Sequence, residues 1–177
     1  VVVVLINGQP LTINWADKHI PAILETWFPS CQGRTIIAET LFGDYNPGGK
    51  LTVPFPKSVG QIELNFPFKP GSHGTQPQSG PNGSGSTRVM GELYPFGHGL
   101  SYTSFEYSDL KVTPLEQKTQ GNYTITFNLT NTGKRQGDEV VQLYVCDKYS
   151  SVVAYNSVLR GFERISLDPG ETKRVAF

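Results

Sequence analysis

Carboxylates that could pair for acid–base chemistry are the first candidates in this sequence. A pair that cleaves a glycosidic bond, for example, must hold its side chains about 5 to 9.5 Å apart, and spacing along a sequence does not show whether two residues meet that condition. Five carboxylates in the N-terminal part could take part: Asp17, Glu25, Glu39, Asp44 and Glu63. We expect each to have a structural role, with Glu39 on the solvent side of a short helix and Asp44 in a turn, because turn and surface carboxylates greatly outnumber catalytic ones.

The histidines and cysteines give little support to triad or metal chemistry. None of His19, His73 and His98 accompanies a serine or cysteine in a nucleophile-elbow pattern such as Gly-x-Ser-x-Gly. His98 lies between two glycines, where it is either a loop base or ligand or, as we expect, a turn residue packed at a domain junction. Cys31 and Cys146 form no Cys-x-x-Cys pair, so we expect no metal site and interpret both as unpaired, partly buried thiols.

Composition argues against several other partners. The 15 Lys and Arg residues balance 15 Asp and Glu residues, so no basic field is available for nucleic acid. The glycine-rich run 80–85 does not join a strand to a helix, as a phosphate-binding loop does, so nucleotide binding is not indicated. The longest apolar run, 1–6, is far shorter than the roughly 20 residues that cross a bilayer. We therefore expect no nucleic acid, no membrane and no cofactor.

Aromatic side chains are the other candidates for binding, because a ring offers a large contact area and can stack on the face of a sugar. Five lie in the N-terminal and central parts of the chain: Trp15, Trp27, Tyr94, Phe96 and Tyr102. We expect most of them to belong to the core.

The elements that would position these residues form an α/β unit in the N-terminal part. The β-branched run 1–6 predicts a strand covered on both faces, as in parallel sheets flanked by helices. A second apolar segment follows at 22–28, and 50–55 predicts a further strand. Between them, 32–42 predicts a short helix with Ser30 as its N-cap and Gly43 as its C-terminal stop. Its apolar face would consist of Ile37, Ala38, Leu41 and Phe42.

A long polar stretch and a change of pattern follow. Residues 69–91 are dominated by Gly, Ser, Pro, Gln and Asn, which indicates either a functional loop or a domain connection. From 123 to 130, apolar and polar residues alternate with the period of a half-buried strand. Further strands are predicted at 105–112, 140–145, 157–165 and 172–177. Five short strands indicate a β-sandwich, and we expect its last strands to lie beyond residue 177 because immunoglobulin-like sandwiches have about seven.

Four long motifs resemble, in order and spacing, the C-terminal half of family 3 glycoside hydrolases. They are VVVVLINGQPL at 1–11, LFGDYNPGGKL at 41–51, YPFGHGLSYT at 94–103 and NTGKRQGDEVVQLY at 131–144, and 159–162 and 167–172 extend the resemblance. The resemblance implies an α/β fragment, part of an α/β sandwich, at 1–70. It implies a Gly/Ser/Pro-rich loop and connection at 71–103, then an all-β immunoglobulin or fibronectin type III-like sandwich at 104–177, with the chain incomplete at both ends.

The same resemblance implies an activity. Family members typically hydrolyse β-linked glucosides or xylosides with retention, using an N-terminal barrel, an α/β sandwich and a fibronectin-like domain. The chain would thus be the C-terminal part of a retaining β-glycosidase acting on terminal sugars of oligosaccharides, a β-glucosidase first and a β-xylosidase next. The family's nucleophile is an Asp of the barrel and its acid/base lies upstream of the strand at 1–6. We therefore expect no catalytic residue and no metal ligand here, leave the substrate-binding residues unassigned, and expect the isolated chain to be inactive.

Other expectations follow from the resemblance or remain open beside it. The substrate would be a β-linked oligosaccharide bound through the missing barrel, and a homodimer is possible. Periplasmic or secreted placement in a bacterium is implied, because such enzymes meet saccharides outside the cytoplasm. No exposed aromatic platform is evident in the fibronectin-like part, which we expect to brace the other domains. The alternative is a non-catalytic carbohydrate-binding or structural interaction module that uses the same pair of folds.

Overall fold

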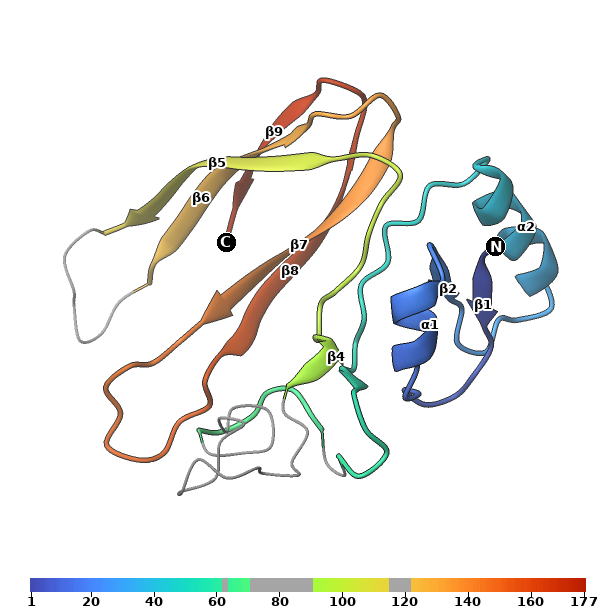
Figure 1. Ribbon diagram of the computed structural model, residues 1–177. Coiled ribbons are helices and arrows are strands. Elements are labelled where there is room, and N and C mark those ends of the chain that lie inside the picture. Colours follow the sequence, from blue (N-terminus) through green and yellow to red (C-terminus); the bar gives the residue numbers. More distant parts are fainter. Residues whose placement is uncertain (62–63, 71–90, 115–121) are drawn as a thin grey trace. The chain divides into compact units, whose positions relative to one another are not determined.

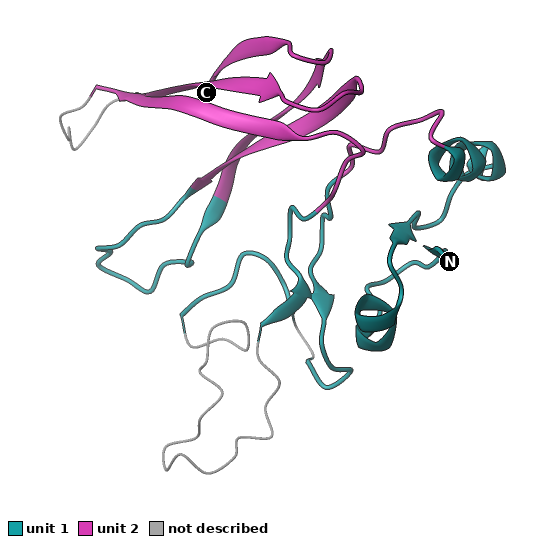
Figure 2. Cartoon of the chain, turned by 45° about the horizontal axis from the view of Figure 1, so that its top comes forward, with its two compact units in different colours: residues 1–42, 50–98, 145–158 teal, residues 43–49, 99–144, 159–177 magenta. Residues whose placement is uncertain are grey.

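The computed structural model describes residues 1–61, 64–70, 91–114 and 122–177, and strands dominate its secondary structure (Figure 1). Two compact units are distinguished by colour in Figure 2. Unit 1 comprises 1–42, 50–98 and 145–158, and unit 2 comprises 43–49, 99–144 and 159–177. Most of the predicted loop 69–91, together with Glu63 and His73, lies outside the described residues. Among the described residues, no helix is long and apolar enough to cross a membrane.

Unit 1 begins with a small parallel sheet. Strand β1 (Val3–Leu5) pairs in parallel with β2 (Ile23–Glu25), with Val3 opposite Ile23 and Leu5 opposite Glu25. Helix α1 (Asn14–His19) lies between them in the sequence, and α2 (Gly33–Phe42) follows β2. Parallel pairing needs such a crossover connection, so the β-branched run and the helical segment are parts of one arrangement. The parallel strand and the short helix predicted from the sequence are confirmed.

The predicted burial of these elements is wrong. Val1 is 93% exposed and Ile6 is 60% exposed, and the three residues of β1 between them are only half-buried. In α2 the buried residues are Gly33 and Thr40, whereas Phe42 is 85% exposed. The helix turns Gly33, Thr40 and the half-buried Ile37 inward, and its predicted apolar face points largely to solvent.

A short antiparallel pair replaces the strand predicted at 50–55. Only β3 (Phe55–Pro56) forms a strand there, and it pairs with β4 (Glu92–Tyr94). The prolines at 54 and 56 have no backbone N–H to donate, which limits the ladder. Phe55 is 1% exposed, and its ring centroid lies 5.9 Å from that of Trp27 and 6.0 Å from that of Tyr94. In this aromatic cluster Phe55 is buried, and Trp27 and Tyr94 are half-buried.

The C-terminal strands form the two sheets of a β-sandwich (Figure 1). In the first sheet β6 (Thr124–Asn131) pairs antiparallel with both β5 (Phe105–Thr113) and β9 (Thr172–Ala176). In the second, β7 (Gly137–Val145) neighbours β8 (Val158–Leu167). The register of β5 shifts between Ser108 and Lys111, where Asp109 has a positive φ of 54°. The strands predicted from the alternating pattern are confirmed.

The core of unit 2 lies between these sheets. Its buried apolar side chains come from both of them: Phe127 and Leu129 from β6, Val175 from β9, Val141 from β7, and Ile165 and Leu167 from β8. From Phe127 to Asn131, residues of β6 alternate between buried and half-buried, with the period of two that the sequence predicted. Sandwich cores are built in this way from the inner faces of two sheets.

A fully buried asparagine completes the core of unit 2. The Asn131 amide nitrogen donates to the backbone oxygens of Arg135 (2.8 Å) and Leu167 (3.0 Å). Its side-chain oxygen accepts from the Thr103 hydroxyl at 2.7 Å and from the Gly133 backbone N–H at 3.0 Å. The amide thus has two donors and two acceptor positions satisfied, which removes the cost of burying a polar group.

Candidate functional site

The segment 43–49 lies within the LFGDYNPGGKL motif. It belongs to unit 2, whereas helix α2, which precedes it, belongs to unit 1. Gly43 has a positive φ of 86°, a backbone conformation that glycine adopts without the steric cost of a Cβ atom. This confirms Gly43 as the C-terminal stop of α2, whose last residue is Phe42. Asp44, Tyr45 and Asn46 follow at once, and Asn46 bonds the residue that precedes strand β7, Gln136.

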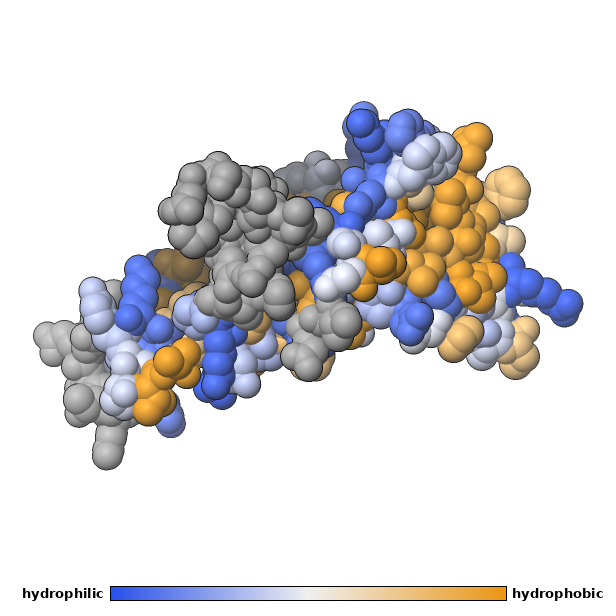
Figure 3. Space-filling model, turned by 60° about the horizontal axis from the view of Figure 1, so that its bottom comes forward, coloured by the Kyte–Doolittle hydropathy of each residue, from blue (hydrophilic) through white to orange (hydrophobic). Residues whose placement is uncertain are grey.

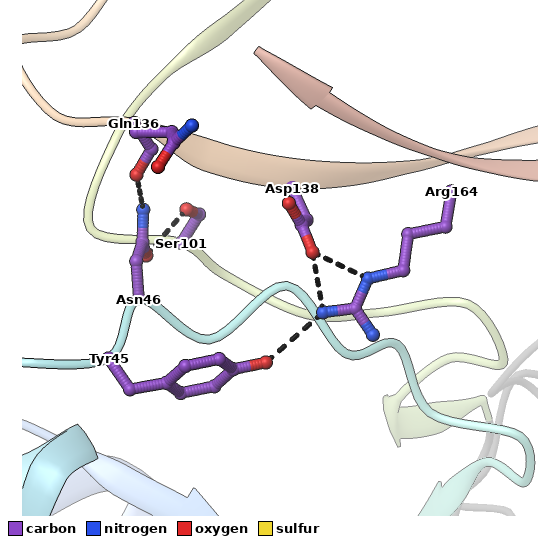
Figure 4. A network of polar contacts seen from close by, with 6 residues as sticks. All are labelled: Tyr45, Asn46, Ser101, Gln136, Asp138 and Arg164. Carbon is purple, nitrogen blue, oxygen red and sulfur yellow. Dashed lines mark hydrogen bonds and ion pairs between the residues drawn. The ribbon is translucent and has the colours of Figure 1, made fainter. Parts of the chain in front are cut away.

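Asn46 holds this segment against two other parts of unit 2 (Figure 4). Its amide nitrogen donates to the Gln136 backbone oxygen at 2.9 Å. Its side-chain oxygen accepts from the Ser101 hydroxyl at 2.9 Å and from the Tyr102 backbone N–H at 2.8 Å. Three of the sequence motifs therefore meet at one side chain.

Arg164 makes the second set of contacts in Figure 4. Its guanidinium bonds the Asp138 carboxylate at 2.7 Å, and one of its nitrogens also donates to the Tyr45 hydroxyl at 3.1 Å. The hydrogen bond to Tyr45, followed by the one to Asp138, raises the pKa of Arg164. Because the Arg164 side chain is 52% exposed, the ion pair contributes only about 0 to 1 kcal/mol. The same guanidinium, through its bond to the hydroxyl, helps to hold the Tyr45 ring.

Two glycines let these parts approach closely. A Cβ atom at Gly48 would lie 2.6 Å from the backbone oxygen of Asp138, and one at Gly137 would lie 2.7 Å from the Asn46 amide nitrogen. Neither position has room for a side chain. Beside these contacts lies an open hollow of about 430 Å³. It is lined by Gly43, Asp44, Tyr45, Asn46, Arg135, Gln136, Gly137 and Asp138. We call it the polar hollow.

The other described carboxylates considered in the sequence lie outside the polar hollow, and two of them accept hydrogen bonds from neighbouring residues. Asp17 accepts a hydrogen bond from the Tyr94 hydroxyl at 2.6 Å. Glu25 accepts from the backbone N–H of Trp27 at 2.7 Å, and its second oxygen is buried without a partner among the described residues. Glu39 is exposed on α2, as expected. Within the described part of the chain, no group of three or more His, Cys, Asp or Glu residues could hold a metal ion.

His98 and its neighbours form an aromatic stack in unit 1. The His98 ring lies parallel to that of Tyr94, with centroids 5.0 Å apart. Burial, followed by the charge of Lys50, lowers the pKa of His98. Burial and the hydrogen bond to Asp17 raise the pKa of Tyr94 to about 12. The backbone N–H of His98 donates to the Pro95 oxygen at 3.1 Å, which closes a turn, and its backbone oxygen accepts from Leu51 N–H at 2.8 Å.

Two expectations about burial are wrong. Trp15 is 68% exposed and Tyr102 is 48% exposed, while the other three aromatic candidates are half-buried. The ring of Trp15 stacks on that of His19 with centroids 4.8 Å apart on the short helix α1, which covers no core. Cys31 and Cys146 are free, as expected, but both are exposed, since each lies in a connection next to an element.

Sequence reasoning did not identify the polar hollow. It placed Asp44 in a turn but gave no role to Arg135, Gln136, Asp138 or Arg164. These residues lie about 90 to 120 positions from Tyr45, and only the sandwich brings them together. The available signal was that both segments belong to motifs of the family resemblance.

Two family models match the chain. Residues 1–102 match the glycosyl hydrolase family 3 C-terminal domain, and residues 139–177 match a fibronectin type III-like domain. A β-xylosidase from Formosa agariphila is 47% identical over 100% of this chain, and a periplasmic β-glucosidase from Salmonella typhimurium is 44% identical over 99% of it. The chain spans only about a quarter of these relatives, 24% and 23% of their lengths.

Solved structures agree with these matches. A β-glucosidase from Erythrobacter marinus is similar with a TM-score of 0.86 and 38% identity, over 99% of this chain and 22% of that one. The Listeria innocua β-glucosidase in complex with isofagomine has a TM-score of 0.88 and 31% identity, over 99% of this chain and 25% of that one. Because a family model covers more than half of the chain and the resemblance continues to its last residue, the chain belongs to glycosyl hydrolase family 3, of which it carries C-terminal-domain and fibronectin type III-like sequence.

Proposed function

We propose that this chain is the C-terminal part of a retaining β-glycosidase that releases terminal β-linked sugars from oligosaccharides, with β-glucosides ahead of β-xylosides as substrates. The observation that carries the proposal is the match of the whole chain to relatives named β-xylosidase and β-glucosidase, of which it spans about a quarter. The contacts found for the carboxylates fit it, since Asp17, Glu25 and Asp138 all hold neighbouring groups. On this proposal the chain alone does not hydrolyse glycosides.

The proposal includes a domain division. Residues 1–70 are the end of an α/β sandwich, 71–103 a connection, and 104–177 a fibronectin type III-like sandwich. The parallel pairing of β1 with β2 supports the first part. So do the exposed apolar residues of unit 1, since Val1, Phe28, Leu41 and Phe42 need cover from elsewhere in a stable protein. Figure 3 shows apolar residues gathered in a continuous area on one face.

We further propose a periplasmic or secreted location in a bacterium, with a homodimer as one possible assembly. One relative is named a periplasmic β-glucosidase, which supports the location. The role of the present chain is then to complete the α/β sandwich and to brace it with the fibronectin-like domain, while the reacting carboxylates belong to other parts of the enzyme.

A chimera tests the proposal. The matching quarter of the Formosa agariphila β-xylosidase is replaced by this chain, and hydrolysis of p-nitrophenyl β-glucoside and β-xyloside is measured for the chimera, for the parent and for the isolated chain. We expect the chimera to retain activity and the isolated chain to have none. Catalysed hydrolysis by the isolated chain would place the reacting groups within these 177 residues and contradict the proposal. A folded but inactive chimera would favour the alternative of a non-catalytic module.

A further inference from the structure

The polar hollow in unit 2 has free hydrogen-bonding groups that its structural network does not use. Among the described residues, the Asp44 carboxylate and the Gln136 side-chain amide have no hydrogen-bond partner. Arg135 donates one nitrogen to the Gly43 backbone oxygen at 3.1 Å, and the remaining N–H groups of its guanidinium have no partner there either. The hollow thus offers a carboxylate, an amide and a guanidinium, all on exposed side chains.

The hollow also has an aromatic wall that is held in place. Tyr45 is 41% exposed, and its hydroxyl accepts a hydrogen bond from Arg164. The segment that carries it is fixed by the three hydrogen bonds of Asn46 and by the close approach of Gly48 to the backbone of Asp138. A ring that is already in position loses little conformational entropy when a ligand binds.

The charges of the hollow favour a neutral ligand. An anion would meet the carboxylates of Asp44 and Asp138, and a cation would meet the guanidinium of Arg135. A sugar ring carries no charge, presents hydroxyls that both donate and accept, and has an apolar face that suits an aromatic ring. The volume of about 430 Å³ falls within the range of pockets that hold small ligands, roughly 300 to 1,000 Å³.

We propose that the polar hollow binds one sugar ring of an oligosaccharide. Tyr45 contacts the apolar face of the ring, and Asp44, Gln136 and Arg135 bond its hydroxyls. The choice of β-linked glucose or xylose units rests on the proposed function, whereas the preference for a neutral polyhydroxylated ligand rests on the hollow itself. This assigns the sandwich a binding role beyond the bracing expected from the sequence.

The test is a titration of the 177-residue chain with cellotetraose and with xylotetraose. Binding is measured by isothermal titration calorimetry and by ¹H–¹⁵N NMR. We expect saturable binding, with shift changes concentrated at 43–46 and 135–137. Tyr45→Ala should weaken binding about tenfold or more, and Tyr45→Phe, which keeps the ring, should weaken it far less. Asp44→Asn and Gln136→Ala, which change groups outside the Asn46 network, should each weaken binding by about three- to tenfold.

Matched controls separate the hollow from the rest of the surface. Phe162→Ala removes a ring that is 69% exposed on β8, and Glu106→Gln changes an exposed carboxylate on β5; neither should alter affinity. If Tyr45→Ala does not fold, Asp44→Asn and the shift map still decide the matter. Absence of saturable binding, or binding that Asp44→Asn and Gln136→Ala leave unchanged, overturns the proposal.

The sugar site and the glycosidase assignment fail separately. An active chimera with no binding by the chain removes the sugar site and leaves the glycosidase assignment intact. Binding by the chain with a folded, inactive chimera removes the glycosidase assignment and leaves the site.

Discussion

Unit 2 and unit 1 bury their apolar side chains to very different extents. Proline apart, six of the seven buried apolar side chains of the described residues lie in unit 2, and Phe55 is the one in unit 1. Unit 1 instead exposes Val1 at 93%, Phe42 at 85% and Phe28 at 76%. Burial of apolar surface is the dominant favourable contribution to folding, so unit 2 has its own source of stability and unit 1 largely lacks one.

This difference indicates that the stability of unit 1 depends on contacts outside the unit more than the stability of unit 2 does. The sandwich of unit 2 encloses a core between its sheets and satisfies its buried Asn131 by itself. The strands of the parallel pair in unit 1 are only half-buried, and Leu41 and Phe42 of its helix α2 are exposed. We therefore expect unit 2 to resist hydrogen exchange more strongly than unit 1 in the isolated chain.

Removing the centre of the unit 2 core should have the largest effect. Leu129 is fully buried, so Leu129→Ala should lower the free energy of unfolding by about 2 to 5 kcal/mol, through lost burial and a cavity. Chemical denaturation followed by near-ultraviolet circular dichroism measures this change. The control is Leu110→Ala at a side chain that is 69% exposed on β5, where we expect less than about 0.5 kcal/mol. Equal effects of the two variants would contradict the core assignment.

The buried asparagine should come next. Asn131→Ala leaves the backbone oxygens of Arg135 and Leu167 without their donor, and it also leaves the Thr103 hydroxyl without its acceptor. We expect a loss of about 2 to 4 kcal/mol, since each unsatisfied buried group costs about 1 to 3 kcal/mol and part of the site can relax. Asn128→Ala on the same strand removes a single exposed bond to Asp109 and should cost less than about 1 kcal/mol. Thermal unfolding of both variants, measured together, checks the difference.

The sequence predicted unit 2 better than unit 1 for the same physical reason. Alternation at 123–130 indicates directly which face of β6 is buried. One face of the strand lies against the core and the other faces away from it, and both environments are set within the same sandwich. In unit 1, the runs at 1–6 and 37–42 predicted the elements correctly and their burial wrongly. An apolar pattern shows that a face needs cover, but it does not show where along the polypeptide the cover lies.

The candidate site was predictable only in part. Asp44 and Tyr45 stood out as a turn within a family motif, but Arg164 is 119 residues away from Tyr45 along the chain. No local pattern encodes a contact of that kind, because it depends on how the strands of the sandwich are ordered. Asn46 is similar, since its polar type suits a turn and gives no sign of the three bonds it makes.

Substitution of an exposed apolar residue in unit 1 should change the free energy of unfolding much less. Phe42→Ser should change the free energy of unfolding of the isolated chain by no more than about 0.5 kcal/mol, because the side chain is 85% exposed. It should nevertheless lower the binding of a hydrophobic fluorescent dye and reduce aggregation. Ile37→Ser, at a half-buried position of the same helix, is the control and should destabilise more. A large destabilisation by Phe42→Ser would show that this side chain is packed, and that unit 1 has a larger core than described.

The smallest effect concerns the turn that joins β8 to β9 in unit 2. The Glu171 carboxylate accepts from the Asp168 backbone N–H at 2.8 Å, and this bond, with a lesser contribution from Lys173, lowers the pKa of Glu171 below its ordinary value of 4.5. A carboxyl group whose pKa is lower in the folded state stabilises the fold at pH values above the unfolded pKa. That stabilisation is lost as the pH falls through the lower, folded value.

Glu171→Gln isolates this contribution, because the amide oxygen can still accept from Asp168 while the group no longer titrates. Between pH 6 and pH 3 the wild-type Tm should fall slightly further than that of the variant, as measured by scanning calorimetry. The excess is small because the turn is open to solvent, where charge interactions are screened. An equal or greater fall in the variant would mean that the Glu171 charge does not support the turn, and the stability of unit 2 at low pH would then rest on its apolar core and on Asn131 alone.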